Sequence, residues 1–154
     1  MISSDSRLVL DSIRRIVRVL RNFSKSTERD FGLSTAQIYV LQKLFEAKRS
    51  LTVNELAEAT LTHQSSVSVV VSKLTSRKLL ERIANEQDSR SVRLSITTEG
   101  KYLLGKSPTS IQDRLTKALS KMSPKERKGL VEGLQALIQK AGMQDDEPSM
   151  LMED

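Results

Sequence analysis

The segment between Thr52 and Thr97 constrains the fold more than any other, because its hydrophobic period changes from that of a helix to that of a strand. Thr52, with Glu55 three residues later, has the pattern of a capping box, which predicts a helix of about two turns. After a tight turn over 60–62, a second helix is predicted for about 63–77. Its inner face would be formed by apolar residues at helical spacing, namely Val67, Val70, Val71 and Leu74.

Two strand-like segments follow this pair of helices. Residues 79–84 and 92–97 alternate between two sets of side chains, and a polar loop, 85–91, separates them. A short helix, a tight turn, a second helix and a hairpin with a polar tip are, in this order, the parts of a winged helix-turn-helix. We therefore expect residues 34–98 to form such a unit, in a mainly α-helical chain with a small β-hairpin wing.

Further helices are predicted on both sides of this unit. The first covers about 6–30 and ends at Gly32, and the next begins with the capping box of Ser34 and Gln37. After the hairpin, a helix is predicted from about Thr98 that Pro108 kinks or breaks. The last helix begins at the cap Ser123, followed by proline at its first position.

The terminal helices carry more apolar surface than a small winged unit needs. The first has a seam of Val9, Ile13, Ile16, Leu20 and Phe23, and the last has a stripe of Leu130, Leu134, Leu137 and Ile138. Such stripes usually need a partner, so segments 6–31 and 99–142 are expected to be dimerisation helices. The alternative is that the two stripes pack on each other within one chain.

The composition argues against several kinds of site. The chain has no cysteine and one histidine, His63, so no metal site and no cofactor are expected. The sequence has no glycine-rich phosphate loop and no Ser/His/Asp set, which argues against an enzyme. No apolar run approaches the roughly 20 residues that cross a bilayer, and the N-terminus lacks the pattern of a signal peptide. A cytoplasmic protein without a membrane partner is therefore expected.

Charge is unevenly distributed along the chain. Residues 143–154 contain five acids and no lysine or arginine, and removing them from the net charge of +6 leaves +11 on the rest. A basic body attracts polyanions, either nucleic acid or an anionic membrane surface. The acidic segment 143–154 is expected to be disordered.

In a winged helix-turn-helix the second helix of the pair enters the major groove of DNA, so its outer face should be small and polar. Gln64 can pair with adenine, Lys73 is placed for a phosphate or a guanine, and Arg90 on the hairpin can enter the minor groove. Asp88 is expected to pair with an arginine and to hold the hairpin in shape. The alternatives are a solvated serine-rich helix and an ordinary loop. The full set of DNA-binding candidates is Thr62, His63, Gln64, Ser65, Ser66, Ser68, Val69, Lys73, Arg77, Asp88, Arg90 and Arg93.

Residues 88–100 resemble the signature of the multiple-antibiotic-resistance regulator (MarR) family, which is Asp-x-Arg, an alternating strand, and Leu/Ile-Thr-x-x-Gly. The resemblance extends from the first helix to about Ala141. It implies a transcriptional regulator, usually a repressor, whose homodimer binds a pseudo-palindromic operator in double-stranded DNA. It also implies release by a small aromatic or anionic effector. The candidate effector-binding residues are Arg14, Arg18, Tyr39 and His63.

Two positions depart from the family pattern. Val69 stands where the family often has a basic residue, and Lys78 replaces a glycine that often ends the recognition helix. If position 78 needs a left-handed backbone, lysine costs roughly 1–2 kcal/mol there, unless the helix ends differently. Two other functions stay open: a non-specific or architectural DNA binder, and a winged-helix module that binds protein. The basic residues of the hairpin and the second helix favour DNA.

Overall fold

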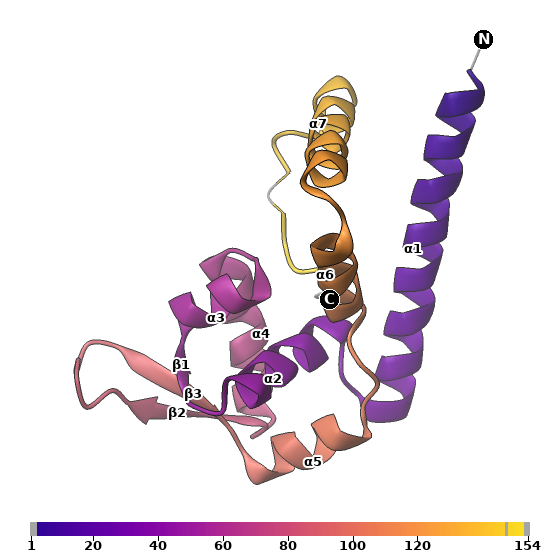
Figure 1. Ribbon diagram of the computed structural model, residues 1–154. Coiled ribbons are helices and arrows are strands. Elements are labelled where there is room, and N and C mark those ends of the chain that lie inside the picture. The colour runs from indigo at the N-terminus through magenta and orange to yellow at the C-terminus, as the bar shows by residue number, and fades with distance from the viewer. Residues whose placement is uncertain (1–2, 147, 153–154) are drawn as a thin grey trace.

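The computed structural model describes residues 3–146 and 148–152, which form a mainly helical chain with one small sheet (Figure 1). The prediction of a mainly α-helical winged helix-turn-helix is confirmed. The elements in chain order are α1 (Ser4–Phe31), α2 (Thr35–Ala47), β1 (Leu51–Thr52), α3 (Val53–Thr60), α4 (Gln64–Ser76), β2 (Leu80–Ala84), β3 (Val92–Ile96), α5 (Thr98–Lys106), α6 (Ile111–Lys121) and α7 (Pro124–Lys140).

Local capping chemistry sets most helix boundaries. The capping boxes predicted at Ser34 and Thr52 are both formed, and the predicted cap Ser123 forms a third with Glu126; each has both of its reciprocal hydrogen bonds. Gly32 ends α1 in a left-handed conformation with φ of 62°. Pro108 lies in the connection between α5 and α6, so the predicted long helix is broken in two.

The wing contains a strand that the sequence did not reveal. The sheet has the order β1-β3-β2, with both pairs antiparallel. β1 is only two residues long. It pairs through Leu51 with Leu94, while β3 pairs on its other side with β2, so that Leu94 lies opposite Arg82. The hairpin is thereby fixed to the start of α3 as well as to the end of α4.

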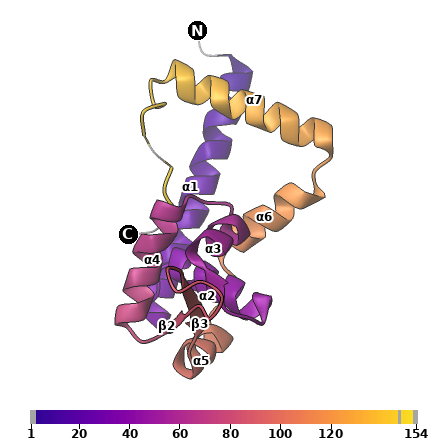
Figure 2. The same ribbon diagram turned by 90° about the vertical axis from the view of Figure 1, so that its left-hand side faces the viewer.

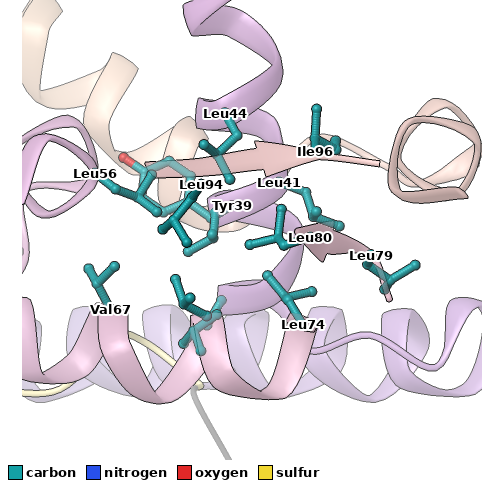
Figure 3. Packing of buried hydrophobic residues seen from close by; sticks show 14 of the residues in the cluster. Tyr39, Leu41, Leu44, Leu56, Val67, Leu74, Leu79, Leu80, Leu94 and Ile96 are labelled. Atoms are coloured by element: carbon teal, nitrogen blue, oxygen red, sulfur yellow. The ribbon is translucent and has the colours of Figure 1, made fainter. Parts of the chain in front are cut away.

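The core of the winged unit lies between α2, α4 and the sheet (Figure 3). The four inner-face residues predicted for α4, Val67, Val70, Val71 and Leu74, are fully buried. Tyr39 and Leu41 of α2 and Leu94 of β3 meet them from the other side. At roughly 1.5–3 kcal/mol for each buried aliphatic side chain, this packing is the main stabilisation of α4.

The terminal helices extend away from the winged unit (Figures 1 and 2). Within the described residues, the apolar stripes of α1 and α7 are not buried on each other: Val9, Ile16, Leu134 and Leu137 are all exposed. The alternative in which the two stripes cover one another within one chain is therefore wrong.

Part of the C-terminal segment contacts the core. Met150 is 2% exposed and belongs to the same core cluster as the inner face of α4. The Gln112 side chain at the start of α6 donates a hydrogen bond to the Leu151 carbonyl at 3.3 Å. Met150 is the buried residue of this segment, whereas Met143, Asp145 and Asp146 are exposed.

Lys78 adopts a left-handed backbone, with φ of 59°. Lysine in place of the usual glycine thus keeps the left-handed helix end, at a cost in conformational energy. Lys78→Gly is expected to raise the free energy of unfolding by about 1 kcal/mol, because glycine adopts this conformation without steric cost. Urea denaturation would measure this. Lys78→Ala is the matched control, since it removes the same charge but keeps the Cβ; an equal gain in both variants would contradict the explanation.

Candidate nucleic-acid interface

The outer face of α4 is exposed and mostly small and polar. Gln64, Ser65, Ser72 and Lys73 all point away from the core, and Val69 among them is 46% exposed. Ser68 is half-buried at the edge of this face. The face is therefore open to a flat or grooved partner, with the valine as its only apolar member.

Ser66 does not belong to this face. It is 8% exposed and lies on the packed side of α4, next to Val67 in sequence. A residue two positions after Gln64 is rotated about 200° around a helix of 3.6 residues per turn, which explains its inward position. The structure therefore contradicts Ser66 as a DNA-contacting residue.

The turn before α4 holds the remaining candidates of this region. His63 is the N-cap residue of α4, but its side chain makes no capping hydrogen bond and the residue is exposed. The Thr62 hydroxyl lies 2.7 Å from that of Thr60, which ties it to the end of α3. His63 is thus available to a partner, whereas Thr62 has a structural contact of its own.

The wing tip is organised by hydrogen bonds within the loop. The Asp88 carboxylate accepts from the Arg90 backbone N–H at 3.0 Å, and Asn85 donates to the Ser91 hydroxyl at 2.6 Å. Asp88 therefore holds the hairpin in shape as predicted, but by a turn of the Asx type, and it forms no ion pair with an arginine in the described part of the chain. The Arg90 side chain is exposed at the tip.

Arg93 is built into the base of the wing. Its guanidinium donates to the Ser50 hydroxyl at 2.9 Å and to the Ser50 carbonyl, and it lies 3.3 Å from the Glu55 carboxylate. A hydrogen bond from the Thr52 backbone, together with Arg49 and Arg93, lowers the pKa of the Glu55 carboxyl. These internal contacts favour a positioning role for Arg93 at the base of the wing, and its contact with DNA remains a prediction.

Arg77 also has an internal partner. Its guanidinium donates to the Gly32 carbonyl in the turn between α1 and α2. The bond connects the end of α4 to the end of the terminal helix α1. The sequence prediction treated Arg77 as a free cation because this partner is 45 residues away in sequence.

The wing is joined to α5 through Thr97. Its backbone N–H donates to the Leu79 carbonyl at 3.1 Å, and its hydroxyl shares one proton between the Lys78 carbonyl at 2.8 Å and the Leu79 carbonyl at 3.1 Å. The hydroxyl also accepts from Gly100 N–H as the cap of α5. A Cβ on Gly100 would lie 2.3 Å from the Leu79 carbonyl oxygen. The Thr-x-x-Gly pattern noted in the sequence therefore marks where the backbone of α5 packs against the Leu79 carbonyl, with no space for a side chain at position 100.

A buried carboxylate joins the winged unit to α6. The Asp113 side chain is 2% exposed and lies 3.3 Å from Lys43 Nζ of α2 and 2.6 Å from Lys117 Nζ of α6. Burial raises the pKa of Asp113, but the two lysines outweigh it and hold this pKa below its ordinary value. Nearby, the Tyr39 hydroxyl lies 3.4 Å from that of Thr116.

The four residues predicted to bind an effector do not converge within one chain. Tyr39 is buried in the core and His63 lies exposed at the N-terminal end of α4. Arg14 and Arg18 lie exposed on α1, where Arg14 pairs with Asp11 at 2.8 Å. A groove of about 300 Å³ lies elsewhere, between α1 and α6. It is lined by Arg15, Ile16, Val19, Leu20, Ile111, Arg114, Leu115 and Ala118.

Two further searches of the structure bear on function. Over 3–146 and 148–152 there is no cluster of three or more histidine or acidic side chains that could hold a metal ion. In the same residues, no helix combines the length and the apolar character needed to span a membrane.

Comparisons with known proteins agree with this geometry. A model of the MarR family matches residues 31–91. The HTH-type transcriptional repressor MdtR of Bacillus subtilis is 32% identical over 97 residues, which are 63% of this chain and 60% of MdtR. The chain thus matches less than two thirds of that relative's length.

Solved structures resemble the chain over more of its length. A MarR family transcriptional regulator of Streptomyces coelicolor, in complex with DNA, matches with a TM-score of 0.62 and 23% identity, over 97% of this chain and 99% of that one. BpsR of Bordetella bronchiseptica, whose DNA binding is regulated by 6-hydroxynicotinic acid, has a TM-score of 0.58 and 25% identity, over 84% and 91% of the two chains.

Proposed function

We propose, from the match of residues 31–91 to the MarR family and from the similarity to the transcriptional repressor MdtR, that this chain is a sequence-specific DNA-binding transcriptional regulator. As a homodimer in the cytoplasm it would bind a pseudo-palindromic operator and repress transcription. It would act by binding and not as an enzyme. The α4 face would read bases in the major groove while the wing contacts the adjacent minor groove.

One observation carries the proposal. The apolar side of α4 is fully buried, whereas Gln64, Ser65 and Lys73 are exposed on its other side and Arg90 is exposed at the wing tip. Small side chains on an exposed helix allow the close approach to base edges that direct readout needs. The revised set of contact residues is His63, Gln64, Ser65, Ser68, Val69, Lys73 and Arg90.

The exposed stripes of α1 and α7 support a homodimer. Val9 and Ile16 on one helix and Leu134 and Leu137 on the other remain uncovered in a single chain. Contiguous apolar surface of this kind is typical of an interface between subunits. Two winged units held by these helices would present two α4 faces to successive major grooves.

Selection of binding sites from a pool of random DNA duplexes tests the function directly. We expect one enriched, pseudo-palindromic sequence, and binding that weakens with salt at a log–log slope of about −0.9 for each phosphate contact. Equal affinity for the enriched duplex and for random DNA would indicate an architectural binder. Failure to bind any duplex at low salt would indicate a module that binds protein.

Arg90→Ala is expected to weaken operator binding about tenfold, near the lower end of the roughly 1–3 kcal/mol expected of a groove contact. The expected reason is loss of a guanidinium from the narrow, electronegative minor groove. Fluorescence anisotropy with a labelled operator duplex measures the change. Arg29→Ala is the charge-matched control, because Arg29 pairs with Asp30 at 2.7 Å in the last turn of α1 and lies on neither α4 nor the wing. An equal loss of operator affinity in both variants would mean that Arg90 contributes only through the net charge of the protein.

We further propose that a small anionic aromatic compound releases the protein from DNA, as 6-hydroxynicotinic acid regulates BpsR. The groove between α1 and α6 is of a size for one ring, and Arg15 and Arg114 at its edge offer cations to a carboxylate. Calorimetric titration with 6-hydroxynicotinate is expected to show binding that Arg114→Ala weakens at least severalfold. Unchanged binding in that variant would place the ligand elsewhere.

A further inference from the structure

The C-terminal segment inserts one side chain into the core. Met150 is 2% exposed and belongs to the core cluster, whereas its neighbours in sequence, Ser149 and Leu151, are exposed. Figures 1 and 2 both show the described end of the chain running from α7 back to the region between α6 and α4. Residues 148–152, which we term the strap, thus place Met150 in a seat that other elements build.

Gln112 of α6 forms a polar side of this seat. The residue is 6% exposed, and its Nε2 donates to the Leu151 carbonyl of the strap at 3.3 Å. Its Oε1 is buried and has no hydrogen-bond partner among the residues that the structure describes. A buried amide oxygen without a donor is unfavourable and is rare in folded proteins. The strap therefore leaves one end of the Gln112 amide unsatisfied.

Several features of the strap favour its exchange with a ligand. Ordering its backbone costs conformational entropy. Met152 adopts a left-handed conformation with φ of 56°, which is unfavourable for a residue with a Cβ. Residues 141–146, which connect the strap to α7, are all exposed. The methionine side chain is flexible and fills gaps of irregular shape, so a ligand of similar width can replace it while the surrounding side chains stay in place.

We infer that the seat of Met150 is a binding site for a small uncharged amide, and that the strap occupies this site as an intramolecular competitor. The ligand combines an unbranched apolar or thioether group, which replaces the Met150 side chain, with a primary amide or a lactam. Such an amide offers a C=O to Gln112 Nε2 and an N–H to the unpaired Oε1, so it satisfies both ends of the glutamine. The site differs from the groove between α1 and α6, which Gln112 does not line, and the inference does not depend on DNA binding.

Titration of the full-length chain with γ-(methylthio)butyramide tests the competition, followed by NMR of isotope-labelled methionine methyl groups. As the amide binds, the Met150 signal is expected to move toward its position in the urea-unfolded chain. The signal of Met143, which is 56% exposed, should stay in place. Met150→Ser vacates the seat and should tighten binding at least fivefold, which corresponds to a wild-type seat that is open for no more than about a fifth of the time. Met143→Ser is the matched control and should leave the affinity unchanged.

A second ligand tests the role of Gln112. The methyl ester of the same acid has the carbonyl but no N–H for Oε1, so the Met150→Ser variant should bind the amide about tenfold more tightly than the ester. Adding Gln112→Leu should remove this preference.

Each part of the inference can fail separately. Equal amide affinity in wild type and Met150→Ser, or a Met150 signal that does not move as the amide binds, would overturn competition by the strap. Absence of amide binding in Met150→Ser would overturn the site. Equal affinity of that variant for amide and ester, or a preference that survives Gln112→Leu, would overturn recognition by Gln112.

Discussion

Gly100→Ala is expected to lower the free energy of unfolding by about 3 kcal/mol, at the high end of the cost of overpacking. The added Cβ would lie 2.3 Å from the Leu79 carbonyl oxygen and 2.9 Å from Ile96 Cγ1. The first of these atoms is backbone and accepts a hydrogen bond from the Thr97 N–H, so it cannot move without loosening the wing. Thermal denaturation would show a decrease in Tm of about 8 °C for a chain of this size.

Gly105→Ala is the matched control on the same helix. A Cβ at position 105 meets nothing within 4 Å, and alanine is favoured over glycine in a helix by about 0.5–1 kcal/mol. The two substitutions should therefore change stability in opposite directions. A Gly100→Ala variant as stable as wild type would show that the wing and α5 are not in contact at this point.

Asp113→Ala is expected to lower the free energy of unfolding by about 2 kcal/mol, because a buried charge network loses its acceptor. Lys43, itself largely buried, would keep only Glu46, at 2.9 Å, as its carboxylate partner. Urea denaturation measures the loss. Lys117→Ala is the control from the same network: this lysine is 64% exposed, and exposed pairs contribute little.

The effect of Asp113 should depend on pH in one direction. Its pKa is lowered in the folded chain, despite the opposing effect of burial, so the carboxylate stabilises the fold above the ordinary pKa of about 3.9. This stabilisation is lost as the pH falls through the lowered value. The difference between wild type and Asp113→Ala should therefore be constant near neutrality and narrow below about pH 4; a difference that persists in acid would assign the loss to packing.

Features encoded by neighbouring residues were predictable. The boxes at Ser34, Thr52 and Ser123 each depend on two side chains three residues apart, and the buried face of α4 follows from one helical period. The valine-rich sequence of α4 favours a strand by propensity, yet the spacing of its apolar residues correctly predicts a helix.

Features that depend on distant partners were not predictable from one sequence. β1 exists only because Leu51 meets Leu94, and two residues carry no period of their own. Arg77 and Arg93 looked like free cations because Gly32 and Ser50, which accept their hydrogen bonds, lie more than 40 residues away. Met150 likewise gave no signal, since a single methionine in an acidic segment is not a pattern.

The contacts of Arg93 with Ser50 and Glu55 fix the base of the hairpin independently of its tip. Arg49 and Arg93 share the Glu55 carboxylate at the base, while the turn from Asn85 to Ser91 closes through its own hydrogen bonds. The loop at the tip is thus held by contacts that are separate from those that fix the base of the hairpin. Loops of other sequence and length should therefore be tolerated between β2 and β3. They should change the DNA preference and leave the melting temperature of the protein unchanged.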